Sequence, residues 1–117
     1  MTYIDGFVLA VPTENKQAYL DHASASVAVF KKYGAIRVVE CWGADIPDGE
    51  VTSFPMAVKC EPGETVVLSW IVWSSKKARD AGMEEAVKDP FFADEDAKVP
   101  FDGSRMIFGG FETILDE

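Results

Sequence analysis

Glu40 is the residue of this sequence whose surroundings best suit acid–base chemistry. It stands in the segment VVECW and shares one face of a predicted strand with Val38 and Trp42. A carboxylate on a covered face is costly unless it is paired or neutral. Glu40 therefore has two interpretations. It forms an ion pair or a hydrogen bond across the contact of a dimer, or it is an acid with a raised pKa that lines a pocket with Trp42.

His22, the only histidine, is the second candidate for acid–base chemistry. It lies on the first predicted helix, beside the inner stripe that begins at Leu20. It could act as a general base in an interior, or be a partly exposed helix residue. No nucleophile motif such as GxSxG accompanies it, and neither Cys41 nor Cys60 has a histidine nearby in the sequence. The candidate catalytic residues are therefore Glu40 and His22.

Arg105 is the candidate for binding an anion, because arginine stays charged and grips carboxylates with two parallel hydrogen bonds. Asp5 is its partner if the ends of the first and last strands meet. If they do not, Asp102, three residues before it, is the nearest acceptor. Arg105 then either locks the turn into the last strand or anchors an anionic substrate at the mouth of a barrel.

Aromatic side chains supply much of the apolar surface and are the candidates for stacking on a planar ligand. Trp42 and Trp70 are predicted to take this part if they face a cavity, and to be core residues otherwise. No GxGxxG follows a strand, and haem ligation would rest on His22 alone. We therefore expect no cofactor, and the absence of CxxC or histidine-rich clusters predicts no metal site.

The charge and the cysteines limit the partners and the compartment. The chain has 117 residues and a net charge of −9, with its lysines and arginines scattered. Binding to nucleic acid or to an anionic membrane needs a basic surface, so both are disfavoured. The N-terminal segment fits neither a signal peptide nor a membrane span. Together with two cysteines interpreted as free thiols, this predicts a cytoplasmic protein.

Hydrophobic periodicity predicts four strands and two helices, which must position these side chains. Residues 3–12 and 65–75 are apolar on both faces, so both faces should be covered. Ser53 is predicted to cap a short helix with Pro55 in its first turn, and the alternative is a short strand from Met56 to Cys60. The predicted strands cover residues 3–12, 35–43, 65–75 and 104–114, and the predicted helices cover residues 13–33 and 75–89.

The order of these elements predicts one α+β domain over residues 1–117, with the ferredoxin-like β-α-β-β-α-β arrangement. Its antiparallel sheet would have the strand order 4-1-3-2 and both helices on one face. The other face would then need a cover, which favours a homodimer whose two sheets enclose a barrel-like interior. Gly109 and Gly110 in the last strand indicate a bulge or a close backbone approach from that second copy.

Several segments also carry a resemblance to a known family. The stretches YIDGFVLAVP, VVECWGADIPDGEVTSF, ETVVLSWIVW with SSKKARDAG, and PFDGSRMIFGGFE resemble the YbaA-like family of bacterial proteins, a domain family of unknown function. The resemblance covers nearly the whole chain. It implies membership of the dimeric α/β barrel superfamily, which includes cofactor-independent monooxygenases, muconolactone isomerase-like enzymes and ligand-binding domains. The fold alone does not select among these.

The sequence thus predicts a cytoplasmic homodimer that binds a small apolar or planar molecule in a barrel interior. Glu40 and His22 would be the catalytic groups of a cofactor-independent monooxygenase- or isomerase-like enzyme. Trp42, Trp70, Arg105 and Asp102 would contact the ligand. The alternative is a ligand-binding or structural dimer without catalysis.

Overall fold

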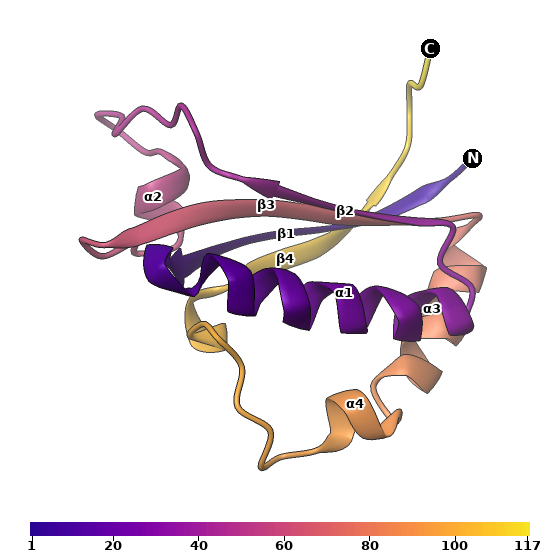
Figure 1. Ribbon diagram of the computed structural model, residues 1–117. Helices are drawn as coiled ribbons and strands as arrows, with labels where there is room; N and C mark the ends of the chain where they lie inside the picture. The colour runs from indigo at the N-terminus through magenta and orange to yellow at the C-terminus, as the bar shows by residue number, and fades with distance from the viewer.

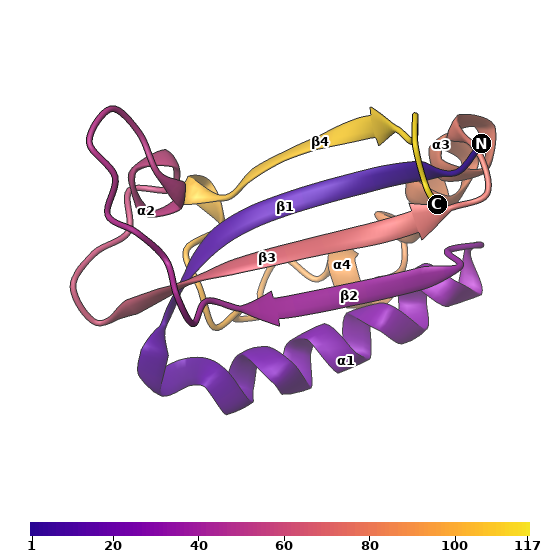
Figure 2. The ribbon, with the colours of Figure 1, turned by 90° about the horizontal axis from the view of Figure 1, so that it is seen from above.

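The sheet consists of four antiparallel strands, and the computed structural model describes all 117 residues around it. The strands are β1 (Tyr3–Pro12), β2 (Arg37–Trp42), β3 (Glu64–Trp73) and β4 (Ile107–Glu112). Their order is β2-β3-β1-β4, as Figure 2 shows from above. This is the predicted order. β4 begins later than predicted because residues 103–105 form a short 3-10 turn.

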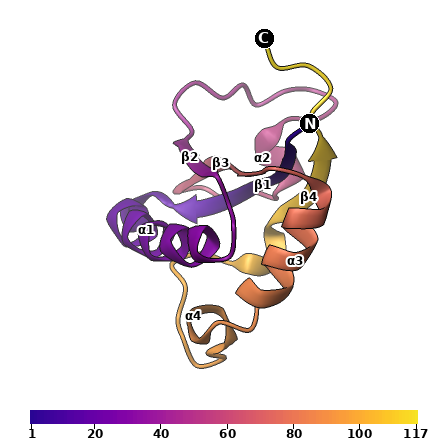
Figure 3. The same cartoon turned by 90° about the vertical axis from the view of Figure 1, so that its right-hand side faces the viewer.

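Two long helices, α1 (Lys16–Lys32) and α3 (Lys76–Ala86), lie on the same side of this sheet (Figures 1 and 3). The single turn α4 (Pro90–Ala93) lies further out on that side, and α2 (Phe54–Ala57) lies near one end of the sheet (Figure 1). We call the side with α1 and α3 the helix face, and the opposite side the open face. No helix is long and apolar enough to span a bilayer.

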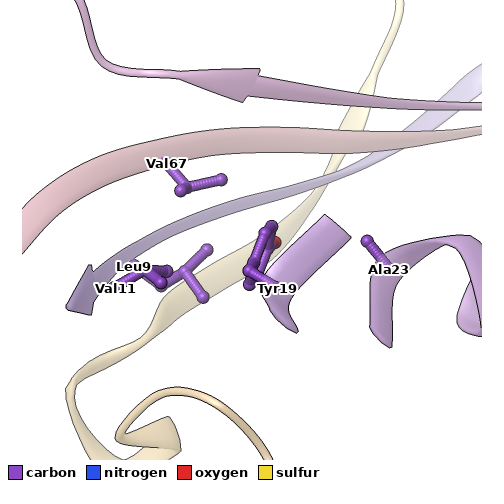
Figure 4. Close-up of a cluster of buried hydrophobic side chains, with 5 residues drawn as sticks. All are labelled: Leu9, Val11, Tyr19, Ala23 and Val67. Carbon is purple, nitrogen blue, oxygen red and sulfur yellow. The ribbon is translucent and has the colours of Figure 1, made fainter. Parts of the chain in front are cut away.

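Side chains of each strand alternate between these two faces. Leu9 and Val11 of β1 pack on the helix face with Val67 of β3 and with Tyr19 and Ala23 of α1 (Figure 4). Toward the other end of the sheet, a second cluster on this face is built from Tyr3, Ala35, Ile71 and Trp73. The register of the strands then places the even-numbered residues of β2, Glu40 included, on the helix face.

The side of α1 that faces the sheet agrees with the predicted stripe at Ala23, which is buried, but not at its start. Leu20 was expected on the inner stripe, but it is 43% exposed, whereas Tyr19 is 6% exposed. The chain enters α1 through a 3-10 turn at Thr13–Asn15. Such a turn has fewer residues per turn than an α-helix, so it changes which residues of the following helix face the core.

The connector between β2 and β3 covers only one end of the open face. Ser53 accepts a hydrogen bond from the main-chain nitrogen of Met56 at 3.1 Å, so the predicted short helix is present and the alternative strand is not. Val58, just after α2, is buried against Ala10 and Val66. Further along, Leu68, Ile107 and Phe111 remain 40, 45 and 60% exposed. Most of this apolar face is therefore uncovered within one chain.

Gly110 is required for a close approach within the chain itself, and the predicted bulge is absent. The pairing of β4 with β1 is unbroken from Ile107 to Glu112. A Cβ atom at Gly110 would come within 2.3 Å of both Arg79 Nη2 and Tyr3 Oη. The side chains of Arg79 and Tyr3, and not the backbone of a second copy, explain this glycine.

Candidate functional site

A cavity of about 170 Å³ lies between the helix face of the sheet, α1 and the segment of residues 91–106. It is open to solvent on one side, and two thirds of its lining residues are hydrophobic. The strands contribute Phe7, Leu9, Glu40 and Ser69, helix α1 contributes Tyr19, His22, Ala23, Ser26 and Phe30, and the following segment contributes Phe92, Phe101 and Met106. Both predicted catalytic residues, Glu40 and His22, therefore line the same cavity.

Glu40 is held in the cavity wall by two hydroxyl groups. The Tyr19 hydroxyl donates to Oε1 and the Ser69 hydroxyl donates to Oε2. Ser69 lies directly opposite Glu40 in the pairing of β2 with β3, and both hydroxyl-bearing residues are buried. Burial and the neighbouring Glu40 carboxylate raise the pKa of Tyr19, so its hydroxyl keeps its proton at physiological pH. Glu40 thus has both of its hydrogen-bond donors within its own chain, and the predicted bond across a subunit contact stays a prediction.

His22 projects from α1 among aromatic rings. Its ring centroid lies 5.3 Å from that of Phe91 and 5.9 Å from that of Phe101. Burial lowers the pKa of His22, and the negative charge of Glu40 opposes this shift. Because the pKa lies below its ordinary value, His22 is predominantly uncharged at pH 7.

Phenylalanines of the segment after α3 form the outer wall of the cavity. The ring of Phe92 lies 5.1 Å from Phe30, and the ring of Phe101 lies 5.8 Å from Tyr19. At one end this segment is fixed by Asp89, whose carboxylate accepts from the main chain of Phe91 at 3.0 Å. At the other end the Asn15 side chain donates to the carbonyl of Pro100 at 3.1 Å. Both anchors hold aromatic rings over α1.

Arg105 lies outside this cavity, and its guanidinium N–H groups donate hydrogen bonds to acceptors of the same chain. It donates to both carboxylate oxygens of Glu64 at 2.7 Å, to Asp102 at 3.0 Å and to the carbonyl of Lys59 at 2.8 Å. The guanidinium holds the pKa of Glu64 below its ordinary range. Asp102 also caps the turn before β4 by accepting from Ser104. These contacts form a lock on the turn, and the anchoring of a substrate anion by Arg105 and Asp102 stays a prediction.

Of the two predicted partners of Arg105, Asp102 is confirmed and Asp5 is wrong, because the relevant strand ends do not meet. Asp5 lies opposite Gly110, five residues along from Arg105. Its carboxylate accepts instead from Arg79 Nε at 3.0 Å and from the Trp73 indole at 2.8 Å. The pair that joins α3 to the centre of the sheet is thus Asp5–Arg79. Arg79 was missed because its surroundings in the sequence are those of an ordinary charged helix.

The two tryptophans predicted to contact a ligand lie away from the cavity. Trp42 is on the helix face, where it packs against the cluster of Leu9 and Val11, with the Lys16 ammonium 5.4 Å from its ring centroid. Trp70 is on the open face, paired with Gly6 across the strands. Their contact with a ligand stays a prediction.

The remaining reactive groups are dispersed. Cys41 and Cys60 are free thiols, and burial raises the pKa of Cys60, which lowers its reactivity. No three histidine, cysteine, aspartate or glutamate side chains come together in a way that could hold a metal ion. The chemistry that this chain can offer from its own side chains is therefore concentrated at Glu40 and His22.

The fold and the cavity define a class: a small α+β domain with a four-stranded antiparallel sheet and an apolar cavity that has one carboxylate in its wall. A family model described as a protein of unknown function (DUF1428) matches residues 2–103. The uncharacterized protein YbaA of Escherichia coli strain K12 is 52% identical over 117 residues, which is all of both chains. The protein of the same name from Shigella flexneri matches equally well. This chain belongs to that YbaA-like family.

Among solved structures, a de novo designed protein, Foldit4, aligns with a TM-score of 0.44 and 10% identity, covering 96% of this chain and 97% of the other. An agreement of this size carries no argument about fold or function.

Proposed function

We propose that this protein binds a small, planar and mostly apolar molecule in the cavity of the helix face. The supporting observation is the combination in one wall of aromatic and aliphatic side chains with a single fixed carboxylate, Glu40. Ligand sites generally combine apolar walls with a few well-placed polar groups. The proposed site is the cavity between the sheet and α1 of one chain, whereas the sequence predicted a site in the interior of a barrel formed by two chains.

Proton transfer of the isomerase kind is the catalytic step that suits these residues best. Such a step needs a base that removes a proton from one atom of the ligand and returns it to another. Glu40 is the candidate base, and the hydroxyls of Tyr19 and Ser69 fix the orientation of its carboxylate. His22 faces the same space and is uncharged at neutral pH, so it can serve as a second proton carrier.

Binding without catalysis is the alternative, and one observation favours it. Each oxygen of Glu40 already accepts a hydrogen bond within the chain, so both oxygens have a partner before a ligand arrives. A carboxylate whose two oxygens already have partners can still accept hydrogen bonds from a ligand through its remaining lone pairs.

We also propose that two ferredoxin-like chains pair through the open face as a dimeric α/β barrel. The apolar side chains that remain exposed there, Leu68, Ile107 and Phe111 among them, support this. The resemblance to the YbaA-like family agrees with this proposal, because it implies membership of the dimeric α/β barrel superfamily. The presence of two free thiols supports a reducing compartment such as the cytoplasm.

Native mass spectrometry of freshly purified protein tests the proposed binding. Ser26 lines the cavity, so Ser26→Phe should fill it and abolish any added mass seen with the wild type. Ser24→Phe makes the same substitution at an exposed serine of the same helix; it is the matched control and should keep that mass. An added mass that persists in Ser26→Phe contradicts the proposal. The proposal is also contradicted if the purified protein carries no ligand and binds neither neutral nor charged ring compounds.

A further inference from the structure

The polar groups in the cavity wall are almost all hydrogen-bond acceptors. Tyr19 and Ser69 donate their hydroxyl protons to Glu40, and Ser26 donates to a main-chain carbonyl of its own helix at 2.7 Å. The oxygens of these hydroxyls can still accept, as can the remaining lone pairs of the carboxylate. Among the lining side chains, this leaves His22 as the only further source of an N–H donor. The wall is therefore suited to a ligand that donates.

No positive side chain lines the cavity. Lys16 is the nearby cation on α1, but its ammonium lies over the ring of Trp42, and Arg105 is bound to two carboxylates elsewhere. An anionic ligand would come to rest beside the Glu40 carboxylate with no cation to compensate. Burying like charges together in an apolar site is strongly unfavourable, so the site selects against anions.

The size of the cavity matches a single six-membered ring. A dry apolar protein cavity of about 150 Å³ accommodates one benzene ring, and this cavity measures about 170 Å³. Phe92, Phe101 and Met106 provide apolar surface in the cavity wall. A fused polycyclic molecule would have to extend through the open side into solvent.

We infer that the ligand of this cavity is a single-ring molecule that donates a hydrogen bond to Glu40 and carries no negative charge, as a phenol or a cyclic enol does. The inference rests on the proposed binding function and adds the chemical class. The donor group lies beside the Tyr19–Glu40–Ser69 cluster, and the ring lies against the phenylalanines of the outer wall.

Three probes of similar size separate the parts of this inference. Phenol has a ring and a donor, toluene has the ring without the donor, and benzoate has the ring with a negative charge. In titrations followed by ¹H–¹⁵N NMR, we expect phenol to bind about tenfold more tightly than toluene, because one hydrogen bond to a charged acceptor has about that worth. Benzoate should bind at least tenfold more weakly than phenol.

Glu40→Gln tests whether the carboxylate sets this selectivity. The variant keeps the shape of the side chain and removes the charge, so it should weaken phenol about tenfold and strengthen benzoate, while toluene changes little. Glu84→Gln, on the exposed side of α3, is the control and should change none of the three. An unchanged ¹H–¹⁵N spectrum away from the cavity verifies that Glu40→Gln folds.

The outcomes distinguish the ligand class from the binding function. Equal affinities for toluene and phenol, or tightest binding of benzoate, overturn the inferred class and leave the proposed cavity function standing. Binding of phenol that Ser26→Phe fails to weaken overturns both, because the probe then binds elsewhere. No binding of any probe at millimolar concentration overturns both as well.

Discussion

The two faces of the sheet differ in the side chains that they carry. The helix face holds two carboxylates, Asp5 and Glu40, each fixed by named donors, together with the cavity. The open face presents apolar side chains, such as Leu68 and Phe111, in the region that the connector leaves uncovered. This contrast is the basis of the two proposals, which place ligand binding on the helix face and self-association on the open face.

The two carboxylates of the helix face differ in a second way. Asp5 is 5% exposed and forms an ion pair with Arg79, and this pair joins α3 to the sheet. Glu40 has only neutral hydroxyl partners and borders the cavity. We therefore expect the removal of Asp5 to affect mainly stability, and the removal of Glu40 to affect mainly the proposed ligand binding.

The largest expected effect is the loss of dimerisation on changing Leu68 to Asp. In a symmetric pair the change would place two carboxylates in the contact, which we expect to weaken association by about 4 kcal/mol, roughly a thousandfold. Sedimentation equilibrium or size-exclusion chromatography with light scattering measures this. Leu20→Asp is the matched control, because Leu20 is 43% exposed, against 40% for Leu68, but lies on α1. A wild-type protein with the mass of one chain contradicts the assignment of the open face.

The next effect concerns the structural carboxylate. Asp5→Asn leaves Arg79 without its buried counter-ion, and we expect the free energy of unfolding to fall by about 3 kcal/mol. Urea unfolding followed by tryptophan fluorescence measures the change. Asp80 also binds Arg79, but its carboxylate is half exposed. Asp80→Asn should therefore leave the stability close to that of the wild type. Equal losses in the two variants would show that burial of the ion pair does not matter.

A smaller loss of stability is expected on removing the Tyr19 hydroxyl that donates to Glu40. Tyr19→Phe leaves Oε1 of Glu40 without its buried hydrogen bond and should cost about 1.5 kcal/mol of unfolding free energy. Tyr33→Phe is the control, because its hydroxyl donates to Asp89, which has other donors nearby. The free energies of unfolding of both variants check this, and Tyr33→Phe should show the smaller loss. A Tyr19→Phe variant as stable as the wild type would argue against a fixed carboxylate at this position.

The smallest effect is the pH dependence that His22 contributes. Its pKa is lowered in the folded chain, so as the pH falls below about 6.5 the unfolded chain takes up a proton first. Stability from this group is therefore complete above that pH and is lost below it, until folded His22 is also protonated. The ring proton signals of this single histidine report its pKa by NMR, and His22→Gln should remove this part of the pH dependence of the urea midpoint. An imidazole that titrates at or above 6.5 is the contrary result.

Much of the fold could be predicted because successive side chains of a strand point to opposite faces of the sheet, so the character of each face can be judged from the sequence. The apolar character of both faces of β1 and β3 was visible from sequence, and the element order then gave the observed strand order. The helix phase was less certain, because the 3-10 turn before α1 leaves no clear signal in the sequence. For this reason Tyr19, the partner of Glu40, was missed in favour of Leu20.

The site could be predicted only where a polar residue interrupts an apolar segment. Glu40 stands out in VVECW, and His22 is the only histidine, so the sequence singled out both, and both line the cavity. Long-range partners leave no such mark: Arg79 contacts Asp5 across 74 residues, and Arg105 contacts Glu64 across 41. Those pairings depend on the register of β1, β3 and β4, which the sequence pattern does not determine.

The most direct test of the two-face account is to locate a bound ring by NMR. With methyl-labelled protein and phenol, we predict intermolecular nuclear Overhauser effects from the ring protons to the methyl groups of Leu9 and Met106, which line the cavity. None should reach Leu68, which lies on the open face. Contacts from phenol to the Leu68 methyl groups, with none to Leu9 or Met106, would contradict the account.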